Sequence, residues 1–503
     1  MTTDAPLVEL LPNVKAFIGE KRKMLIDGKW VTAKSGEFFE VVNPATGEVI
    51  AHAPSGGKAD VDAAVAAAKR AFESGPWGKI TPAERGKIIW RIGDLIMKYQ
   101  EELAQLEALD NGKPISVARA ADVVLAAELF QYMAGWCTKL DGRVLNLSVP
   151  YTPGVEYHAY TRREPVGVVA QIIPWNFPLL MAAWKLGPAL ASGCTVVMKL
   201  AEETPLSGLK LAEIMQEAGV PDGAVNIITG FGETCGAPLA AHPDVAKVAF
   251  TGSTEVGKLI ARAASNDLKK VTLELGGKSP NIILNDADLN IAIPSAANAI
   301  FFNHGQCCCA GSRLFIQEGV YDEVVAGIAE IARNMKVGPG LDPTTEMGPL
   351  VSQVQFDRVS GFLKSGIDQG ASFAAGGARV GDKGYFVAPT VITNVREDMK
   401  VYQEEIFGPV VTATRFKDAD DELLRMANDT IYGLGGGVYT RDISKAHKIA
   451  ARIRTGTVWI NTYNIFDASM PFGGFKQSGW GREMGVEVFN NYLETKSVCV
   501  GLG

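Results

Sequence analysis

Three consecutive cysteines, Cys307, Cys308 and Cys309, follow a Gly-Gln pair in the segment 302–313. A thiolate is a strong nucleophile, and a positioned, partly accessible cysteine can form a covalent acyl intermediate. Free cysteine is also a good small core residue, which is the simpler explanation for the other four cysteines of the chain. The triplet therefore predicts a nucleophile, and any of its three thiols could serve.

A cysteine nucleophile needs a hydrogen-bond donor for the oxyanion that it creates. Asn176 lies in the motif Pro-Trp-Asn-Phe-Pro at 174–178, directly after an apolar strand pattern. That position corresponds to the carboxyl end of a parallel strand, where open α/β sheets bind their ligands. An amide donor there could contribute about 3–4 kcal/mol. The alternative is that Asn176, between two prolines, is only a turn residue.

A covalent intermediate also needs a base that releases it. Glu274 ends the apolar strand pattern at 271–275, just before Gly276-Gly277-Lys278. A carboxylate that closes an apolar strand is poorly solvated, which raises its pKa toward the range of a useful general base. The alternatives are a side chain turned to solvent or an ion pair with Lys278.

A Gly-rich turn at 250–258 joins an apolar strand pattern to a helical one. Backbone N–H groups and the helix dipole at such a turn favour a pyrophosphate, although plain packing explains many turns of this kind. Lys199 and Glu202 follow the preceding strand and could bind ribose hydroxyls, or could be solvated loop charges.

Metal chemistry is not expected, because the chain has five scattered histidines, no H-E-x-x-H motif and no paired C-x-x-C motif. A Cys–His hydrolase with His304 as its base is conceivable. However, His304 is only four residues from Cys308, and no orienting acid or amide can be assigned to it.

A chain of 503 residues is expected to form two or three domains. The net charge of −7 gives no electrostatic footprint for nucleic acid. The most apolar region, 166–198, is interrupted by prolines and Lys185, so we expect no membrane span. Met1 to Lys15 lacks the pattern of a secretory signal. An odd number of cysteines, seven, predicts no disulfide framework and a reducing cytoplasm.

The elements that must position these residues alternate along the chain. Apolar residues at helical spacing predict helices over 59–74, 81–110 and 115–135. Apolar runs at 166–173, 194–198, 224–228, 245–250 and 271–275 predict a parallel sheet with helices on both faces. A second strand–helix alternation runs from 281 to about 479, and the tail, 491–500, is predicted to be a strand with no partner nearby.

Five ordered motifs together resemble those of the aldehyde dehydrogenase superfamily, in its hydrolytic NAD(P)-dependent branch. They lie at 174–178, 250–254, 273–278, 302–308 and 404–409, continue at 471–479, and the resemblance extends from 26 to 496. The resemblance implies an α/β fold with a Rossmann-like NAD-binding domain, a second α/β catalytic domain and a small β oligomerisation arm. The implied bounds are 8–146 with 166–273, then 274–482, and 147–165 with 483–503.

The resemblance also implies roles for single residues. Cys308, two positions after the Gly-Gln pair, would be the nucleophile; Asn176 and the Cys308 N–H would form the oxyanion hole, and Glu274 would activate water. Glu202 would repel a ribose 2′-phosphate, which favours NAD over NADP, although Leu200 stands where the family commonly has proline. The implied cofactor residues are Ile172, Trp175, Lys199, Glu202, Gly232, Gly252, Ser253, Leu275, Glu405 and Phe407.

By the same resemblance the substrate tunnel is apolar and aromatic, with Asp467 as the one charge near its mouth. Such a lining suits a ring-bearing or longish apolar aldehyde. The resemblance favours phenylacetaldehyde, oxidised to phenylacetate, with retinal-like, betaine aldehyde and broad aliphatic specificities as alternatives. A CoA-acylating enzyme and a catalytically silent relative are further alternatives. A homo-oligomer is expected, a tetramer before a dimer. The implied tunnel residues are Phe177, Met181, Trp184, Phe302, Cys307, Cys309, Phe466 and Phe472.

Overall fold

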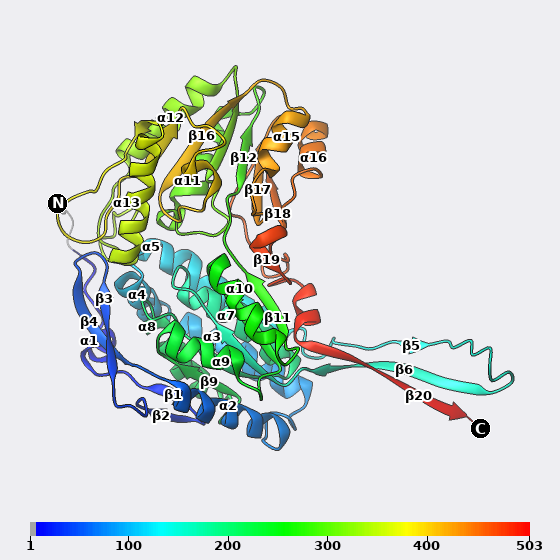
Figure 1. The fold of residues 1–503 in the computed structure, drawn as a ribbon. Helices are drawn as coiled ribbons and strands as arrows, with labels where there is room; N and C mark the ends of the chain where they lie inside the picture. Colours follow the sequence, from blue (N-terminus) through cyan, green and yellow to red (C-terminus); the bar gives the residue numbers. More distant parts are fainter. Residues whose placement is uncertain (1–6, 503) are drawn as a thin grey trace.

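The computed structural model describes residues 7–502. Residues 1–6, at the start of the segment in which no secretory signal was expected, and Gly503, the last residue of the predicted arm, lie outside this range. The chain forms two α/β lobes and a thin β arm that projects from the body (Figure 1).

The first lobe is built on an eight-stranded sheet of order β19-β11-β10-β7-β8-β9-β1-β2. Its five inner strands are parallel, as the apolar runs predicted, and the edge strands are antiparallel. The strands are β1 (Met24–Ile26), β2 (Lys29–Val31), β7 (Val168–Ile172), β8 (Thr195–Lys199), β9 (Val225–Ile228), β10 (Lys247–Thr251), β11 (Lys270–Glu274) and β19 (Gly479–Trp480).

Helices cover both faces of this sheet because the strands are apolar on both sides. In β7, Val168 and Ile172 pack in one core cluster with α2, α9 and α10, whereas Val169 packs in another with α3, α6, α7 and α8. This alternation is the two-residue period of a strand. The helices are α2 (Lys58–Glu73), α3 (Pro82–Lys98), α6 (Val123–Ala134), α7 (Pro178–Ser192), α8 (Leu206–Ala218), α9 (Ala237–Ala241) and α10 (Thr254–Ser265).

Two predicted helices are interrupted. The segment 81–110 forms α3 and α4 (Gln100–Asp110), which meet at Tyr99. Thr81 begins α3 with a capping box to Glu84, and Pro82 occupies the first turn, where its missing N–H has no cost. The segment 115–135 contains α5 (Ile115–Val117), a π-helical turn at Ala118–Asp122, and α6. Such π-turns are frequent at functional sites.

The second lobe carries a seven-stranded sheet of order β14-β15-β16-β13-β12-β17-β18, parallel except for β14. Helices α11 and α12 pack on one face, and α13, α15 and α16 on the other. The strands are β12 (Pro280–Ile283), β13 (Arg313–Gln317), β14 (Ser372–Ala375), β15 (Thr390–Thr393), β16 (Val410–Phe416), β17 (Gly435–Tyr439) and β18 (Thr457–Ile460); the helices are α11 (Leu289–Phe301), α12 (Tyr321–Asn334), α13 (Gln353–Asp368), α14 (Lys400–Gln403), α15 (Asp421–Asn428) and α16 (Ile443–Ala450).

Smaller elements complete the body. Helix α1 (Pro12–Gly19) lies near a hairpin of β3 (Phe38–Asn43) and β4 (Glu48–Pro54). The bounds of the predicted domains stay a prediction, although the strand β19, which follows the second lobe in sequence, returns to the first sheet beside β11.

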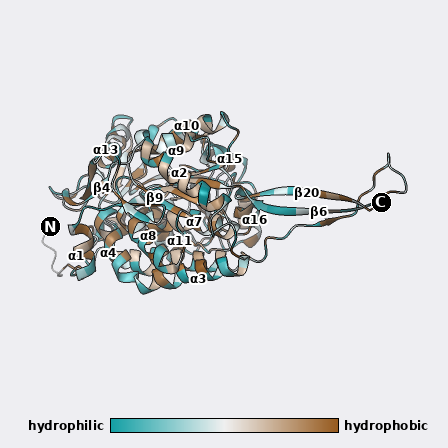
Figure 2. Cartoon of the chain, turned by 90° about the horizontal axis from the view of Figure 1, so that it is seen from below, coloured by the Kyte–Doolittle hydropathy of each residue, from teal (hydrophilic) through white to brown (hydrophobic). Residues whose placement is uncertain are grey.

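The predicted tail strand forms, and it has no partner close to it in sequence. Strand β20 (Leu493–Leu502) pairs along its whole length with β6 (Glu156–Pro165), and β5 (Val144–Leu145) pairs with the other side of β6. Its partner lies more than 300 positions earlier in the chain, within the segment 147–165 that the resemblance placed in the same arm. Together the three strands form the projecting arm (Figure 2), whose exposed apolar side chains include Val144, Tyr151 and Val500.

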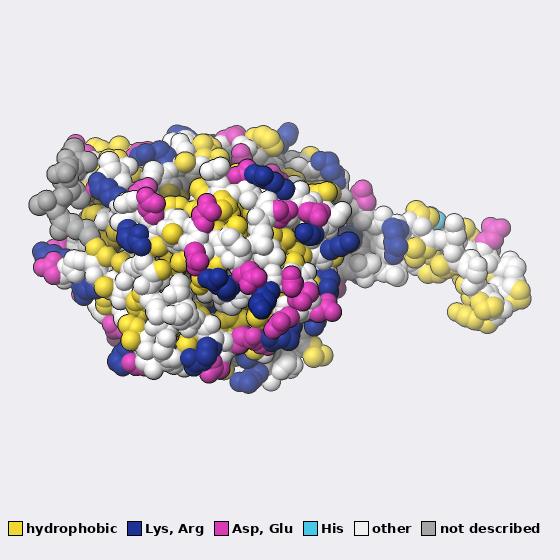
Figure 3. All heavy atoms as spheres, turned by 90° about the horizontal axis from the view of Figure 1, so that it is seen from above, with side chains coloured by type: hydrophobic (Ala, Val, Ile, Leu, Met, Phe, Trp, Pro, Cys, Tyr) yellow, Lys and Arg dark blue, Asp and Glu magenta, His cyan; other side chains and the backbone are white. Residues whose placement is uncertain are grey.

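On the face of the body shown in Figure 3, basic and acidic side chains are interspersed. Among residues 7–502, no helix is both long enough and apolar enough to cross a membrane.

Candidate active site

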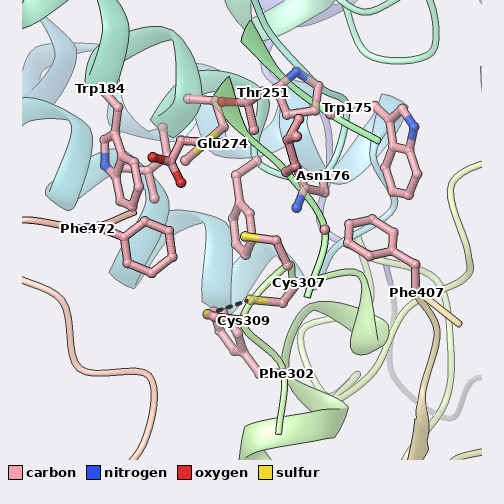
Figure 4. A pocket seen from close by; sticks show the side chains of 18 of the residues that line it. Trp175, Asn176, Trp184, Thr251, Glu274, Phe302, Cys307, Cys309, Phe407 and Phe472 are labelled. Atoms are coloured by element: carbon pink, nitrogen blue, oxygen red, sulfur yellow. Dashed lines mark hydrogen bonds between the residues drawn. The ribbon is translucent and has the colours of Figure 1, made fainter. Parts of the chain in front are cut away.

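The carboxyl ends of the parallel strands in the first lobe bring the predicted residues to one edge of the sheet. Thr251 and Glu274 are the last residues of β10 and β11, and Asn176 lies in the turn that joins β7 to α7. Cys308 approaches this edge from the second lobe, in the loop between α11 and β13. All four side chains line one cavity of about 450 Å³. Figure 4 shows Asn176, Thr251 and Glu274 in this cavity.

The loop that carries Cys308 has an unusual backbone. Asn303, His304 and Gly305 all have positive φ angles, of 50°, 60° and 68°. A Cβ atom at Gly305 would lie 1.9 Å from the carbonyl oxygen of Gly408, and one at Gly277 would lie 2.1 Å from the carbonyl oxygen of Cys308. The two glycines therefore let neighbouring backbone come close enough to hold the Cys308 loop in place.

The three thiols differ in their surroundings. Cys307 and Cys309 are buried, and their sulfur atoms are 3.4 Å apart, whereas Cys308 is half-buried. The hydrogen bond with Cys307, burial, and the nearby carboxylate of Glu274 raise the pKa of the Cys308 thiol. Exposure thus separates Cys308 from its neighbours as the thiol that a ligand in the cavity can meet.

Asn176 is held with its amide directed toward the Cys308 loop. Its Nδ2 donates to the carbonyl oxygen of Gln306 over 3.0 Å, and its side chain is 4 % exposed. One amide hydrogen is used in that bond, so the second remains available to an oxyanion. Asn176 is therefore more than a turn residue.

Glu274 is 5 % exposed, and neither of its carboxylate oxygens has a hydrogen-bond partner within residues 7–502. Burial, reinforced by the charge of Glu483, raises the pKa of Glu274 well above its ordinary value. The alternative ion pair with Lys278 does not form: the Lys278 ammonium is itself buried and without a hydrogen-bond partner in the described chain. Glu274 thus has the electrostatics of a general base.

The Gly-rich turn lies where a dinucleotide could bind. Ser253 caps α10 by accepting a hydrogen bond from Val256 N–H at 3.2 Å, and Ser253 also lines the cavity, so the N-terminus of α10 lies at the cavity. Gly276 leaves room for the Glu405 carboxylate, which would lie 2.2 Å from a Cβ there. Thr251 contributes a buried hydroxyl without a partner among residues 7–502. These groups fit the ribose and phosphates of NAD.

Glu405 and Phe407 come from the second lobe. Glu405 accepts a hydrogen bond from Gly277 N–H at 2.8 Å, and burial raises the pKa of Glu405 to about 7. Phe407 packs edge-on against Trp175, with ring centroids 5.2 Å apart. Both rings lie on the side of the cavity opposite Trp184 and Phe472 (Figure 4).

Of the predicted cofactor residues, Trp175, Gly252, Ser253, Leu275, Glu405 and Phe407 line the cavity. Four others do not: Ile172 is buried in β7, Gly232 begins a π-helical turn, and Lys199, the last residue of β8, forms an ion pair with Glu202. Ion pairing shows that the two charges are not simply solvated, but their contact with a ribose stays a prediction.

All eight predicted tunnel residues line the cavity. At one end, the rings of Trp184, Phe466 and Phe472 contact one another, with centroids 5.5 to 6.2 Å apart. Phe177 stacks on Phe302 at 6.0 Å. The side of the cavity away from Trp175 is therefore an aromatic box, and the described lining is mostly apolar.

Several lining residues were not anticipated. Asp122, Asn298, Arg358 and Asn464 also line the cavity, whereas Asp467 lines a small neighbouring hollow with Glu128. The place of Asp467 at the tunnel mouth stays a prediction, and Asp122 and Arg358 are further charged residues of the cavity itself. No sequence signal distinguishes Asp122 from the other polar residues of 115–135, because its place in the cavity depends on the π-turn.

His304 does not support the Cys–His hydrolase. Its Nδ1 lies 3.3 Å from Gln306 Nε2, and its Nε2 has no partner among the residues described. Burial lowers the pKa of His304 to about 3, so the ring is neutral. Within residues 7–502, no group of three or more His, Cys, Asp or Glu residues is arranged to hold a metal ion.

Comparisons with known proteins agree with this geometry. The sequence profile of the aldehyde dehydrogenase family matches residues 30–498. A putative aldehyde dehydrogenase, DhaS, from Bacillus subtilis is 51% identical over 98% of this chain and 99% of its own length. An aldehyde dehydrogenase from Aspergillus niger is 50% identical over 95% of both chains.

Solved structures show the same fold. An NAD+ complex of an aldehyde dehydrogenase from Bacillus cereus superposes with a TM-score of 0.97 at 51% identity, covering 99% of this chain and 100% of that one. A betaine aldehyde dehydrogenase from Staphylococcus aureus, also in complex with NAD+, has a TM-score of 0.94 at 40% identity and 97% coverage of both chains. The chain belongs to the aldehyde dehydrogenase family.

Proposed function

We propose that the protein oxidises an aldehyde to a carboxylic acid with NAD, through a covalent intermediate on Cys308. The observation that carries the proposal is the meeting of Cys308, Asn176 and Glu274 in one cavity. The NAD+ complexes of the similar proteins from Bacillus cereus and Staphylococcus aureus support the choice of cofactor.

The first step uses the nucleophile and the oxyanion donor. The Cys308 thiolate attacks the aldehyde carbon, so that a C–S bond forms and the carbonyl π electrons move to oxygen. Asn176 Nδ2 and the backbone N–H of Cys308 stabilise the alkoxide, a contribution of about 3–4 kcal/mol for one donor. When bound, NAD supplies the acceptor for the hydride whose departure turns the thiohemiacetal into a thioester.

The second step uses the base. Glu274 takes a proton from water, the resulting hydroxide attacks the thioester carbon, and the C–S bond breaks to release the acid and the thiolate. The raised pKa of Glu274 suits this role, because it makes the carboxylate a stronger base than an ordinary glutamate. The carboxylate oxygens of Glu274 have no partner among residues 7–502, and the side chain lines the cavity, so they can accept a hydrogen bond from a water molecule there.

The cofactor side of the cavity favours NAD over NADP. Glu202 would place a carboxylate near the adenosine ribose, where a 2′-phosphate would be repelled. Lys199 is paired with Glu202, which reduces the cation's ability to offset that repulsion. Lys199, Glu202, Ile172 and Gly232 are proposed contacts of the adenosine half, which the cavity lined by Trp175 and Glu405 does not include.

We propose phenylacetaldehyde, oxidised to phenylacetate, as the preferred substrate. The aromatic box of Trp184, Phe466 and Phe472 can stack on a phenyl ring, and ring pairs of this kind contribute about 0.5–1.5 kcal/mol beyond area burial. A panel of aliphatic, aromatic and quaternary-ammonium aldehydes tests this directly. A higher kcat/KM for betaine aldehyde or for short aliphatic aldehydes would replace phenylacetaldehyde with that class.

Cys308→Ala tests the covalent mechanism. The variant should form no NADH from phenylacetaldehyde and NAD, whereas Cys309→Ala, at a neighbouring wall position, should retain turnover. Turnover by Cys308→Ala would refute the mechanism. NADH formation that depends strictly on CoA would indicate an acylating enzyme, although Glu274 argues against one. No NAD binding and no selective alkylation of Cys308 by iodoacetamide would indicate a silent relative.

We further propose that the arm of β5, β6 and β20 joins subunits into a homotetramer. Its exposed apolar residues and its projection from the body support this use, since a lone three-stranded arm has little core of its own. Seven free thiols in the described chain fit a reducing compartment, for which we propose the cytoplasm.

A further inference from the structure

The peptide carbonyl of Asn176 is held by two other asparagine side chains. Asn303 Nδ2 donates to it over 2.9 Å from the Cys308 loop, and Asn111 Nδ2 donates over 3.4 Å from the end of α4. Asn111 Nδ2 also donates to the adjacent carbonyl of Trp175 at 2.8 Å. Hydrogen bonds from both lobes thus hold the turn that carries the oxyanion donor.

Asn303 also reaches the carbonyl that orients the Asn176 amide. Its Nδ2 lies 3.0 Å from the carbonyl oxygen of Gln306, the same oxygen that accepts from Asn176 Nδ2. Gln306 is two residues before Cys308. A single side-chain nitrogen therefore bridges the backbone of the oxyanion turn and the backbone of the nucleophile loop.

In all three asparagine side chains, only the amide nitrogen makes hydrogen bonds within the described chain. The side-chain oxygens of Asn111, Asn176 and Asn303 are all buried without a hydrogen-bond partner in the part of the chain that the structure describes. Their partners on the nitrogen side are carbonyl oxygens, which only accept, so the orientation of each amide is fixed by its surroundings. Buried polar atoms without partners are uncommon and call for a reason.

Asn303 carries a further cost, since its φ angle of 50° lies in the left-handed region. Residues held there are strained by about 1–3 kcal/mol unless the surroundings compensate. Asparagine tolerates this conformation better than most residues and supplies the bridging donor as well.

We propose that Asn303 and Asn111 are positioning residues, which set the distance and direction of Asn176 relative to Cys308. This inference rests on the proposed function, because it concerns the same oxyanion site. An oxyanion donor is effective only when it is held in place before the reaction, and a misplacement of about 1 Å can cost about 100-fold in rate. Neither residue needs to touch the substrate.

A double-mutant cycle separates positioning from general stability. The rate of the NADH burst, which reports acylation, is measured for the full-length protein, Asn303→Gly, Asn176→Ala and the double variant. Glycine is chosen because it accepts the φ of residue 303 without strain. Asn176→Ala should slow the burst by about 100- to 1,000-fold.

If Asn303 acts through Asn176, Asn303→Gly slows the burst by about 10-fold in the parent but by about twofold or less in the Asn176→Ala background. Asn111→Ala, whose backbone is unstrained, goes through the same cycle and should show the same loss of effect. Equal losses with and without Asn176, in both cycles, would overturn the inference.

Asn226→Ala is the matched control. Asn226 is a buried amide in the same sheet that also donates to two backbone carbonyls, those of Val196 and Gly223, at 3.2 and 2.8 Å. The Asn226→Ala variant should have a lower melting temperature, while its burst rate stays within about twofold of the parent. A burst rate lowered by Asn226→Ala as much as by Asn303→Gly and Asn111→Ala would show that any buried amide has this effect, and would overturn the inference.

A parent protein that forms no NADH with any aldehyde would overturn the proposed function together with this inference. Equal losses with and without Asn176, in a parent that is active, would overturn the inference alone.

Discussion

Lys185 donates to Glu483 across 2.7 Å, and both side chains of this ion pair are almost completely buried. The pair connects α7 to the segment that follows β19. It also acts on the candidate base: beyond the effect of burial, the charge of Glu483 raises the pKa of Glu274, and the charge of Lys185 lowers it. The ion pair thus contributes to the tuning of Glu274.

Removing either partner should shift the pH dependence of thioester hydrolysis. Glu274 must be deprotonated to act, so the rate rises as the pH passes upward through its pKa. Glu483→Gln removes a negative charge and leaves Lys185, so the pKa falls and the rise moves to lower pH; Lys185→Met moves it to higher pH. The rate of thioester hydrolysis, measured as a function of pH for both variants, checks this prediction. Shifts of the two pH profiles in the same direction would contradict it. Each variant should also lose about 3–5 kcal/mol of stability.

Glu274→Gln should separate the two chemical steps. The amide cannot accept a proton from water, so the first turnover forms NADH while hydrolysis slows by about 100- to 10,000-fold. A stopped-flow trace should therefore show a burst of one NADH per active site followed by a nearly flat phase. Loss of the burst itself would mean that Glu274 acts before the thioester forms.

Phe466→Ala should selectively lower the activity toward aromatic aldehydes. The ring lies 5.7 Å from Phe472 and 6.2 Å from Trp184, so its removal opens the aromatic box. We expect kcat/KM for phenylacetaldehyde to fall about 10-fold, and that for propanal to change little. Phe38→Ala, in the β3 hairpin away from the cavity, is the control. Equal losses for both aldehydes would argue against ring recognition.

Glu202→Gln should relax the choice of cofactor. The substitution removes the carboxylate that repels a 2′-phosphate and frees Lys199 from its ion pair. We expect kcat/KM for NADP to rise about 10-fold, the effect of about 1.4 kcal/mol. Glu213→Gln removes another ion-paired carboxylate of the same lobe and should leave the NADP rate unchanged. An unchanged ratio in Glu202→Gln would place the discrimination elsewhere.

Deletion of residues 491–503 should break the oligomer. Strand β20 covers one edge of β6, and its loss leaves ten residues of β6 with an unpaired edge. Size-exclusion chromatography should then show monomers or aggregates in place of a tetramer. A tetramer that survives the deletion would show that subunits associate through another surface.

Much of this protein follows from its sequence alone. Apolar runs of five or so residues at strand length, separated by helical periodicity, predict parallel sheets, and the sheet of β7, β8, β9, β10 and β11 confirms this. The positions of Asn176 and Glu274 at strand ends follow from the same local pattern. The reason is that local periodicity reports which faces must be buried, and parallel strands all end at one edge.

Only the tertiary structure determines which residues face one another across the cavity. Asn176 and Gln306 meet although 130 positions separate them, and the register of the tail strand on β6 joins residues more than 300 positions apart. Asp122 enters the cavity through a π-turn that no periodicity reveals. Such contacts depend on how the two lobes pack together, and packing is a property of the whole chain, because each contact is stabilised by the burial of surfaces far apart in sequence.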